Sequence, residues 1–215
     1  MLIPKTIHQI WSSCNKPLPK AFVDLANTWK EFHPDWQYIF WDDQKMTAFM
    51  QRYYPDYVNF YNRFAYDVQR WDVIRYLILY QVGGLYVDFD TECLANIEAL
   101  LTADCCFGTD TKDNIIYAPL VKNAYLNNTY IASVPKHPFL KSVIDHVFNS
   151  DQMYVKEENK LLQVLRTSGA LMLSDVYNQY AFKEQIHVIP AEDLAPFSLL
   201  EAHAILAGEE KDEWN

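Results

Sequence analysis

Two aspartates, Asp88 and Asp90, stand one residue apart in the run Leu85–Asp90, LYVDFD. The alternation of this run is typical of a β-strand, which would send both carboxylates to the same side, roughly two rises of 3.3 Å apart. Two like charges at that spacing favour a bound cation, and carboxylate oxygens are the ligands that a hard divalent ion prefers. The pair therefore indicates a metal site at the end of a strand.

The segment before this strand predicts the helix that positions it. Apolar residues recur there at three- and four-residue spacing, the period of one buried helical face. These residues are Val68, Trp71, Ile74, Leu77, Ile78 and Val82. Gly83 and Gly84 then predict the end of the helix, because glycine tolerates the left-handed backbone of a helix C-terminus. The pattern is therefore an amphipathic helix, a Gly-Gly stop and a short strand.

Two pairs of opposite charges belong to this helix. Asp72 and Arg75 are three residues apart and share a face, and Asp67 and Arg70 share another. In isolation each would be a surface ion pair worth under about 1 kcal/mol. Taken alone, the helix therefore indicates surface ion pairs, one of which, Asp72 and Arg75, precedes the Gly-Gly stop and the two aspartates.

Strand and helix patterns alternate along the chain. Residues 2–11 read as a strand, 20–32 as a helix and 36–41 as a second strand, and a further helix follows Asp42. Such alternation favours a parallel sheet with crossover helices. The length suits one domain, so we expect an α/β fold with a mostly parallel, Rossmann-like sheet flanked by helices. We expect the domain to span 1–206 and an acidic, flexible tail 207–215.

Trp11 follows the first predicted strand and has two interpretations. At the carboxyl end of a parallel strand, where α/β sheets bind ligands, its indole could stack on a flat base. Tryptophan is also highly buried on average, so a place in the core is an equal alternative.

Composition limits the partners. The formal net charge is -10, which argues against nucleic acid, because phosphate backbones need a basic surface. The four cysteines lack metal-binding spacing and are expected as reduced thiols. We see no secretory signal and no apolar run of about 18 residues. The expectation is a cytoplasmic protein without a transmembrane segment, with peripheral association at the inner membrane face as its one possible membrane contact.

Several runs of this sequence resemble a known protein family. The run RWDVIRYLILYQVGGLYVDFD is similar to the signature of the DXD-motif sugar-transferring glycosyltransferases of family 32, which include yeast-type mannosyltransferases and bacterial capsule enzymes. It is also similar to the donor site of the large clostridial glucosylating toxins. The runs IPKTIHQIW, NTYIASVPKHPF and RTSGALML resemble further family blocks, with Ala170 where a proline usually stands. The resemblance covers most of residues 2–175.

The resemblance implies a GT-A fold that binds a nucleotide-diphospho-sugar and Mn²⁺ or Mg²⁺. Trp11 would stack on the base, and Asp72 and Arg75 would hold the sugar and the donor. Asp88 would meet the ribose or sugar and the metal, while Asp90 would coordinate the metal directly. The residues implied to line the donor pocket are Gln9, Gly84, Tyr86, Asn128, Ser168 and Gly169.

The family commonly supplies one more metal or diphosphate contact from a late loop. His203 is the candidate third metal ligand, although the sequence around it matches poorly and a lone histidine is more often structural.

The leading hypothesis is a metal-dependent glycosyltransferase that moves a hexose from a UDP- or GDP-sugar to a carbohydrate or lipid-linked glycan, as in surface polysaccharide synthesis. Retention of the anomeric configuration is implied by the resemblance, and no residue is assigned as nucleophile. A second hypothesis is a sugar-nucleotide-binding or carbohydrate-binding module without turnover. A metal-dependent phosphoryl-transfer enzyme ranks lower, because the chain lacks a P-loop.

Overall fold

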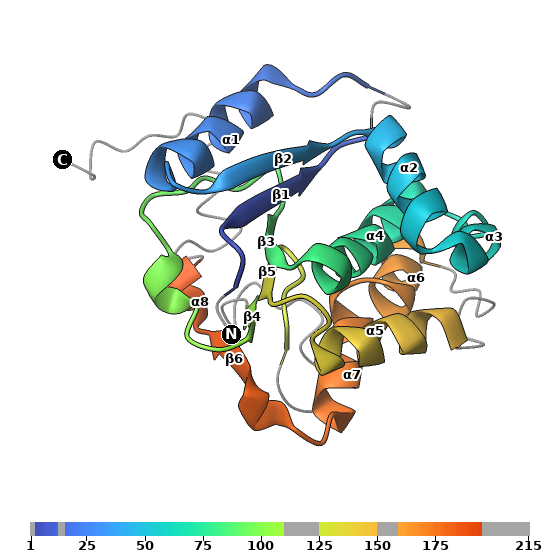
Figure 1. The fold of residues 1–215 in the computed structure, drawn as a ribbon. Coiled ribbons are helices and arrows are strands. Elements are labelled where there is room, and N and C mark those ends of the chain that lie inside the picture. Colours follow the sequence, from blue (N-terminus) through green and yellow to red (C-terminus); the bar gives the residue numbers. More distant parts are fainter. Residues whose placement is uncertain (1–2, 13–15, 110–124, 150–158, 195–215) are drawn as a thin grey trace.

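The computed structural model describes residues 3–12, 16–109, 125–149 and 159–194. Figure 1 shows a sheet between helices. The strands are β1 (Thr6–Ile10), β2 (Gln37–Trp41), β3 (Gly84–Val87), β4 (Cys105–Gly108), β5 (Tyr130–Ser133) and β6 (Ile186–Ile189). The α-helices are α1 (Lys20–Phe32), α2 (Asp43–Tyr53), α3 (Val58–Tyr61), α4 (Asp67–Val82), α5 (Pro138–Asn149), α6 (Lys160–Thr167), α7 (Ala170–Gln179) and α8 (Ala191–Leu194). The 3₁₀ turns are η1 (Pro55–Tyr57), η2 (Glu98–Leu100) and η5 (Lys183–Gln185).

The sheet has the strand order β2-β1-β3-β5-β4-β6. β1 pairs in parallel with β2 and β3, and β4 pairs in parallel with β6. β5 runs antiparallel to both of its neighbours, β3 and β4. The predicted mostly parallel α/β sheet is therefore confirmed, with β5 as the reversed strand that the sequence pattern did not indicate.

Helices cover both faces of the sheet. On one face, Trp29 of α1 packs with Leu85 and Val87 of β3. On the other, Tyr86 of β3 packs with residues of α4, α5 and α7. Successive side chains of β3 thus enter different cores, as the two-residue period of a strand requires. Figure 1 shows the same layers, with α1 beside β1 and β2 and the group α4 to α7 on the opposite side.

Helix α4 is more buried than its sequence pattern predicted. All residues from Asp72 to Leu79 are buried, including charged Asp72 and Arg75, whereas predicted core residue Val82 is 39% exposed. The expectation of one apolar face and one solvated face was wrong, because the sheet, α5 and α6 cover the middle of this helix from several sides. Two charged groups inside the protein require partners, since burying an unpaired charge is costly.

The predicted Gly-Gly stop is confirmed. Gly83 and Gly84 have φ angles of 70° and 107°, in the region that favours glycine. The buried imidazole of His8 holds this junction: its Nδ1 accepts from Trp41 Nε1 at 3.1 Å, and its Nε2 donates to the Gly83 carbonyl at 2.9 Å. Burial lowers the pKa of His8 to about 4, so the ring is neutral at physiological pH. The end of α4 is thereby fixed against β1 and β2.

Among the described helices, none is long and apolar enough to cross a membrane. The predicted acidic tail 207–215 lies outside the described residues, so the proposed boundary near residue 206 stays a prediction.

Candidate active site

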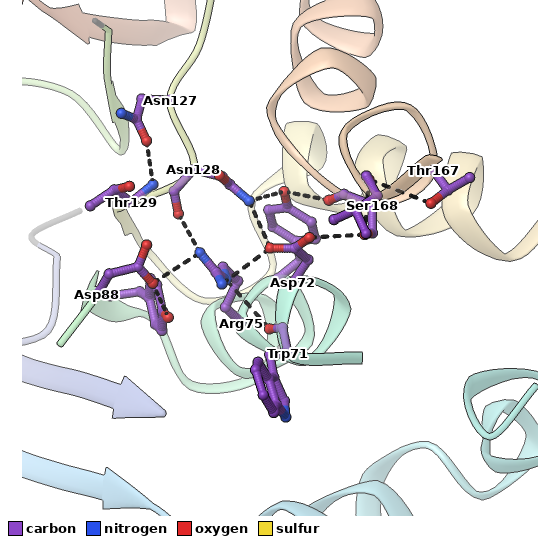
Figure 2. A network of polar contacts seen from close by, with 12 residues as sticks. Trp71, Asp72, Arg75, Asp88, Asn127, Asn128, Thr129, Thr167 and Ser168 are labelled. Atoms are coloured by element: carbon purple, nitrogen blue, oxygen red, sulfur yellow. Dashed lines mark hydrogen bonds and ion pairs between the residues drawn. The ribbon is translucent and has the colours of Figure 1, made fainter. Parts of the chain in front are cut away.

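Three charged side chains form the centre of the candidate site. Arg75 contacts two carboxylates: its Nη2 lies 3.1 Å from Asp72 Oδ1 and its Nη1 lies 3.2 Å from Asp88 Oδ1. Figure 2 shows Arg75 between these two residues. Because Asp72 belongs to α4 and Asp88 follows β3, the arginine links the helix to the carboxyl end of the strand. One positive charge faces two negative ones, which leaves the cluster with an excess of negative charge.

Side chains from two distant segments hold Asp72. Asn128 Nδ2 donates to Asp72 Oδ1 at 2.9 Å, and its backbone carbonyl accepts from Arg75 Nη1 at 2.8 Å. Ser168, which is fully buried, donates to Asp72 Oδ2 at 2.9 Å. The asparagine precedes β5 and the serine follows α6, so the network joins segments about one hundred residues apart (Figure 2). Candidates Asn128 and Ser168 thus contact the same carboxylate.

Burial sets the proton affinities in this network. Desolvation raises the pKa of Asp72 to about 6, although Arg75 and the hydrogen bonds from Ser168 and Asn128 oppose the increase. Desolvation also disfavours the charge on Arg75, but the carboxylates of Asp88 and Asp72 together with Tyr86 outweigh it and raise its pKa. The arginine is therefore permanently charged, whereas Asp72 becomes protonated in mildly acidic solution.

The side chain and the backbone carbonyl of Asp88 both accept hydrogen bonds. Tyr86 donates to Asp88 Oδ1 at 2.5 Å, and the Arg75 guanidinium lies over the Tyr86 ring, 4.4 Å from its centroid. The Asp88 carbonyl accepts from Gln9 Nε2 at 3.1 Å and from Thr91 Oγ1 at 2.6 Å. The Asp88 side chain remains 28% exposed, so a ligand can reach it.

The chain turns where the sequence predicted a continuous strand. β3 ends at Val87, and Asp90 lies in the turn that follows. The expectation that Asp88 and Asp90 alternate along one strand was wrong, since a turn rather than the pleat directs the second carboxylate. Asp90 is exposed at the surface, yet partial desolvation, and then the negative charge of Asp88, raise its pKa. A cation placed beside both carboxylates would relieve that repulsion.

Trp11 is neither fully buried in the core nor fully exposed for stacking on a base. It is half-buried, and its ring packs edge-on against Phe22 at 5.6 Å and against Phe89 at 6.2 Å between centroids. Phe89 lies between Asp88 and Asp90, so the indole adjoins the aspartate turn at the carboxyl end of β1. Its contact with a base stays a prediction.

The structure does not bring every candidate into the network. Gly84 begins β3, at the opposite end from Asp88, where a Cβ would lie 2.6 Å from the Thr6 carbonyl and 2.7 Å from His8 Nε2. It thus permits a close approach of β1 and β3 and lies away from the carboxylates. Gly169 precedes α7 beside Ser168. His203 lies outside the described residues.

Sequence reasoning did not find three members of the network. Tyr76 donates to the Ser168 carbonyl at 2.9 Å, and Gln69 Nε2 donates to Thr167 Oγ1 at 2.6 Å. Tyr76 lies four residues after Asp72, so helical spacing placed it on the same side. The link from Gln69 to Thr167 had no such signal, because it depends on how α6 packs against α4.

Known proteins are similar to this chain in sequence and in fold. Residues 19–107 match the family model described as a glycosyltransferase sugar-binding region containing a DXD motif. Residues 19–107 therefore resemble the sugar-binding region of DXD-motif glycosyltransferases. The resemblance predicted from the sequence is confirmed, and Asp88 and Asp90 are the aspartates of the motif.

Two relatives and one solved structure illustrate the similarity. Inositol phosphoceramide mannosyltransferase 1 of Schizosaccharomyces pombe is 31% identical over 194 residues, which cover 88% of this chain and 56% of the relative. An uncharacterized glycosyltransferase of Acanthamoeba polyphaga mimivirus is 26% identical over 204 residues, covering 92% of this chain and 75% of the relative. The UDP-bound glycosyltransferase domain of the YGT toxin superposes with a TM-score of 0.60 at 11% identity, covering 94% of this chain and 82% of the domain.

The structural match confirms the predicted GT-A fold around the DXD motif. The chain spans about half the length of its inositol phosphoceramide mannosyltransferase relatives.

Proposed function

We propose that the chain is a metal-dependent, retaining glycosyltransferase that moves a hexose from a nucleotide-diphospho-sugar to a hydroxyl of a glycan or glycolipid. This proposal rests on the network of Asp72, Arg75 and Asp88, which lies beside exposed Asp90 at the carboxyl edge of the sheet. In the reaction, a bond forms between the acceptor oxygen and the anomeric carbon. The bond from that carbon to the diphosphate oxygen breaks, and the hydroxyl proton leaves with the diphosphate.

The two carboxylates of Asp88 and Asp90 fit a metal ion that binds together with the diphosphate of the nucleotide sugar. Within the described part of the chain, no group of three or more His, Cys, Asp or Glu side chains could hold a metal. Asp88 and Asp90 supply two carboxylates with an excess of negative charge, and Mg²⁺-like ions bind through one or two carboxylates plus substrate phosphates and water. Bound there, Mn²⁺ or Mg²⁺ would neutralise charge on the leaving diphosphate. His203 stays a proposed third ligand.

The buried network suits the sugar end of the donor. Asp72 offers a carboxylate whose position is fixed by Arg75, Asn128 and Ser168, which is the preorganisation needed to read hydroxyl groups. Arg75 supplies a permanent positive charge between Asp72 and Asp88, near the place where the diphosphate would meet the metal. Trp11 is the proposed partner of the base, since it adjoins the aspartate turn through Phe89.

The relatives support mannose as the first sugar to test. The Schizosaccharomyces pombe relative is named for mannosyl transfer to inositol phosphoceramide, a glycolipid acceptor. The YGT toxin domain binds UDP, which keeps UDP-sugars as the second donor class. A cytoplasmic location, with peripheral association at a membrane surface, remains a prediction for the chain.

Replacement of Asp90 by Asn tests the function. We expect Asp90→Asn to lower Mn²⁺-dependent hydrolysis and transfer of GDP-mannose or a UDP-hexose at least a hundredfold, because one of the two carboxylates loses its charge. Asp35→Asn, in an exposed turn before β2, is the matched control and should keep wild-type rates. Wild-type rates in Asp90→Asn with metal present would contradict the proposal.

The second candidate, a binding module without turnover, makes a different prediction. Calorimetric titration would show binding of a nucleotide sugar with Mn²⁺, whereas the turnover assay would show neither hydrolysis nor transfer.

A further inference from the structure

The backbone carbonyl of Asp88 accepts two side-chain hydrogen bonds. Thr91 Oγ1 donates to it at 2.6 Å, and Gln9 Nε2 donates to it at 3.1 Å. A carbonyl oxygen has two lone pairs, so these donors use its full capacity. Because the peptide bond is planar, a fixed carbonyl also fixes the direction in which the chain continues through Phe89 to Asp90. The two donors therefore act on the turn that carries the second aspartate of the motif.

The carboxylate of Asp90 depends on this turn for its position. In the described part of the chain, no side chain donates a hydrogen bond to it, and the residue is exposed. The Asp88 carboxylate, in contrast, is held directly by Tyr86 and Arg75. Groups that orient a metal ligand through hydrogen bonds commonly contribute about 10–100-fold to metal affinity. For Asp90, that orientation has to come from the backbone of the turn.

Helix α1 holds Thr91 in place. Trp29, which is 1% exposed, donates from Nε1 to the Thr91 carbonyl at 3.0 Å and to Thr91 Oγ1 at 3.2 Å. Since an indole N–H can only donate, the Thr91 hydroxyl accepts from Trp29 and keeps its own proton for the Asp88 carbonyl. Thr28 Oγ1, next to Trp29, accepts from the backbone N–H of Cys93 at 2.8 Å. Helix α1 thus fixes the chain at Thr91 and again two residues later.

Strand β2 orients Gln9 in a similar way. Tyr38 Oη donates to Gln9 Oε1 at 2.7 Å. The Asp88 carbonyl can only accept, so the nitrogen of the Gln9 amide must face Asp88 and its oxygen must face Tyr38. Burial raises the pKa of Tyr38 to about 12, so its hydroxyl keeps the proton that it donates. Gln9 has 0% of its surface exposed and can therefore act on a bound donor only through other residues.

We propose that Thr91 and Gln9 are positioning residues that hold the turn from Asp88 to Asp90 in the conformation that binds the metal ion. Trp29 of α1 supports Thr91, and Tyr38 of β2 supports Gln9. Both positioning residues act through the carbonyl at the start of the turn, without touching the ion or the donor. This inference rests on the proposed function and adds the residues that prepare its metal site.

Substitution of Thr91 tests the proposal by metal binding. Thr91→Val replaces the hydroxyl by a methyl group of similar volume, whereas Thr91→Ser keeps the hydroxyl. The protein is titrated with Mn²⁺ in the presence of UDP in one series and GDP in the other, and free Mn²⁺ is measured by electron paramagnetic resonance. We expect Thr91→Val to weaken Mn²⁺ binding about tenfold or more. Thr91→Ser should bind Mn²⁺ as the wild type does.

Tyr38→Phe tests the Gln9 half of the arrangement. Without the tyrosine hydroxyl, the Gln9 amide is free to rotate away from the Asp88 carbonyl, while the contact of Lys30 with the ring at 4.3 Å is retained. We expect Mn²⁺ binding to weaken about 3–10-fold, the equivalent of one hydrogen bond. If Thr91→Val fails to fold, Tyr38→Phe decides the test.

Ser133→Ala is the control for the loss of a buried hydroxyl. Ser133 of β5 pairs with Gly84, at the end of β3 opposite Asp88, and its hydroxyl donates to the Val134 carbonyl at 2.9 Å. Ser133→Ala and Thr91→Val should each lower Tm by about 2–4 °C, because each removes one buried hydrogen bond. Mn²⁺ affinity should fall in Thr91→Val alone, which a merely structural role of Thr91 would not produce.

The readouts separate this inference from the proposed function. Wild-type Mn²⁺ affinity in Thr91→Val and Tyr38→Phe, or an equal loss in Thr91→Val and Thr91→Ser, would overturn the positioning role and leave the function standing. Mn²⁺ binding by the wild type without hydrolysis of a nucleotide sugar would overturn the function alone. Absence of both in the wild type would overturn the function and the positioning role with it.

Discussion

Asp72 shows how a single residue can favour function over stability. Its carboxylate is buried, and desolvation raises its pKa to about 6 despite the adjacent arginine. The folded protein therefore binds a proton on Asp72 more tightly than the unfolded chain, whose carboxyl group titrates near 3.8. At neutral pH the ionised form costs stability, and that cost disappears as pH falls through 6 towards 4. A buried carboxylate whose ionised form costs stability indicates a role in ligand binding.

Asp72→Asn should stabilise the protein and inactivate it. The neutral amide avoids the desolvation cost, while Ser168 can turn its hydroxyl to accept a hydrogen bond from the new amide. At pH 8 we expect the free energy of unfolding to rise by on the order of 3 kcal/mol, the equivalent of the pKa shift. The gain should shrink between pH 6 and pH 4, where wild-type Asp72 becomes protonated in the folded state. Urea unfolding across this pH range measures it.

The exposed residue Asp175 of α7 provides the control for this experiment. Asp175→Asn should change the free energy of unfolding by under about 0.5 kcal/mol at each pH, as surface substitutions usually do. A destabilised Asp72→Asn at pH 8 would show that the attraction to Arg75 outweighs the desolvation of Asp72, contrary to the pKa direction.

At the scale of elements, the junction of α4 and β3 sets the position of the site. Gly84 lets β3 approach β1 so closely that Gln9 of β1 reaches the Asp88 carbonyl. Gly84→Ala should cost about 3 kcal/mol or more in urea unfolding, because its φ of 107° strains an L-residue and the new methyl group meets the Thr6 carbonyl.

Gly108→Ala is the matched control for this junction. Gly108 ends β4, and a Cβ there would meet the flexible Leu194 side chain at 3.1 Å rather than a backbone atom. We expect a change of under about 1 kcal/mol. Equal losses in the two variants would show that the close approach of β1 and β3 is not the cause.

Local sequence patterns predicted some of the helices and strands and missed others. Helix α1 has the predicted ends, and β2 begins one residue later than predicted and ends where predicted, because repeating apolar residues and proline breaks specify them locally. The reversed direction of β5 and the turn after Val87 were not predicted, since both depend on pairing between distant strands. The candidate site followed mainly from the family resemblance: no local period relates Asp72 to Asn128 or Ser168, which tertiary packing brings together.

At the scale of the whole molecule, the proposed donor site connects segments that are far apart in the sequence. Asp72 and Arg75 belong to α4, Asp88 and Asp90 follow β3, and the remaining contacts come from β1, from the segment before β5 and from the end of α6. A ligand bound there contacts the native arrangement and not the unfolded chain. Donor binding should therefore stabilise the entire fold.

The stabilisation of the fold by donor binding can be measured as an increase in Tm. A ligand at one hundred times its dissociation constant adds about 2.7 kcal/mol, and a protein of 150–250 residues gains roughly 2–4 °C in Tm per kcal/mol. GDP-mannose or the matching UDP-sugar with Mn²⁺ should thus raise Tm by about 5–10 °C at that concentration. Because the proposed ion joins Asp88 and Asp90 to the diphosphate, EDTA or Asp90→Asn should remove most of the shift, whereas Asp35→Asn should retain it. A full shift without the ion would contradict a metal-bridged donor, and a shift with one nucleotide alone would identify the donor class.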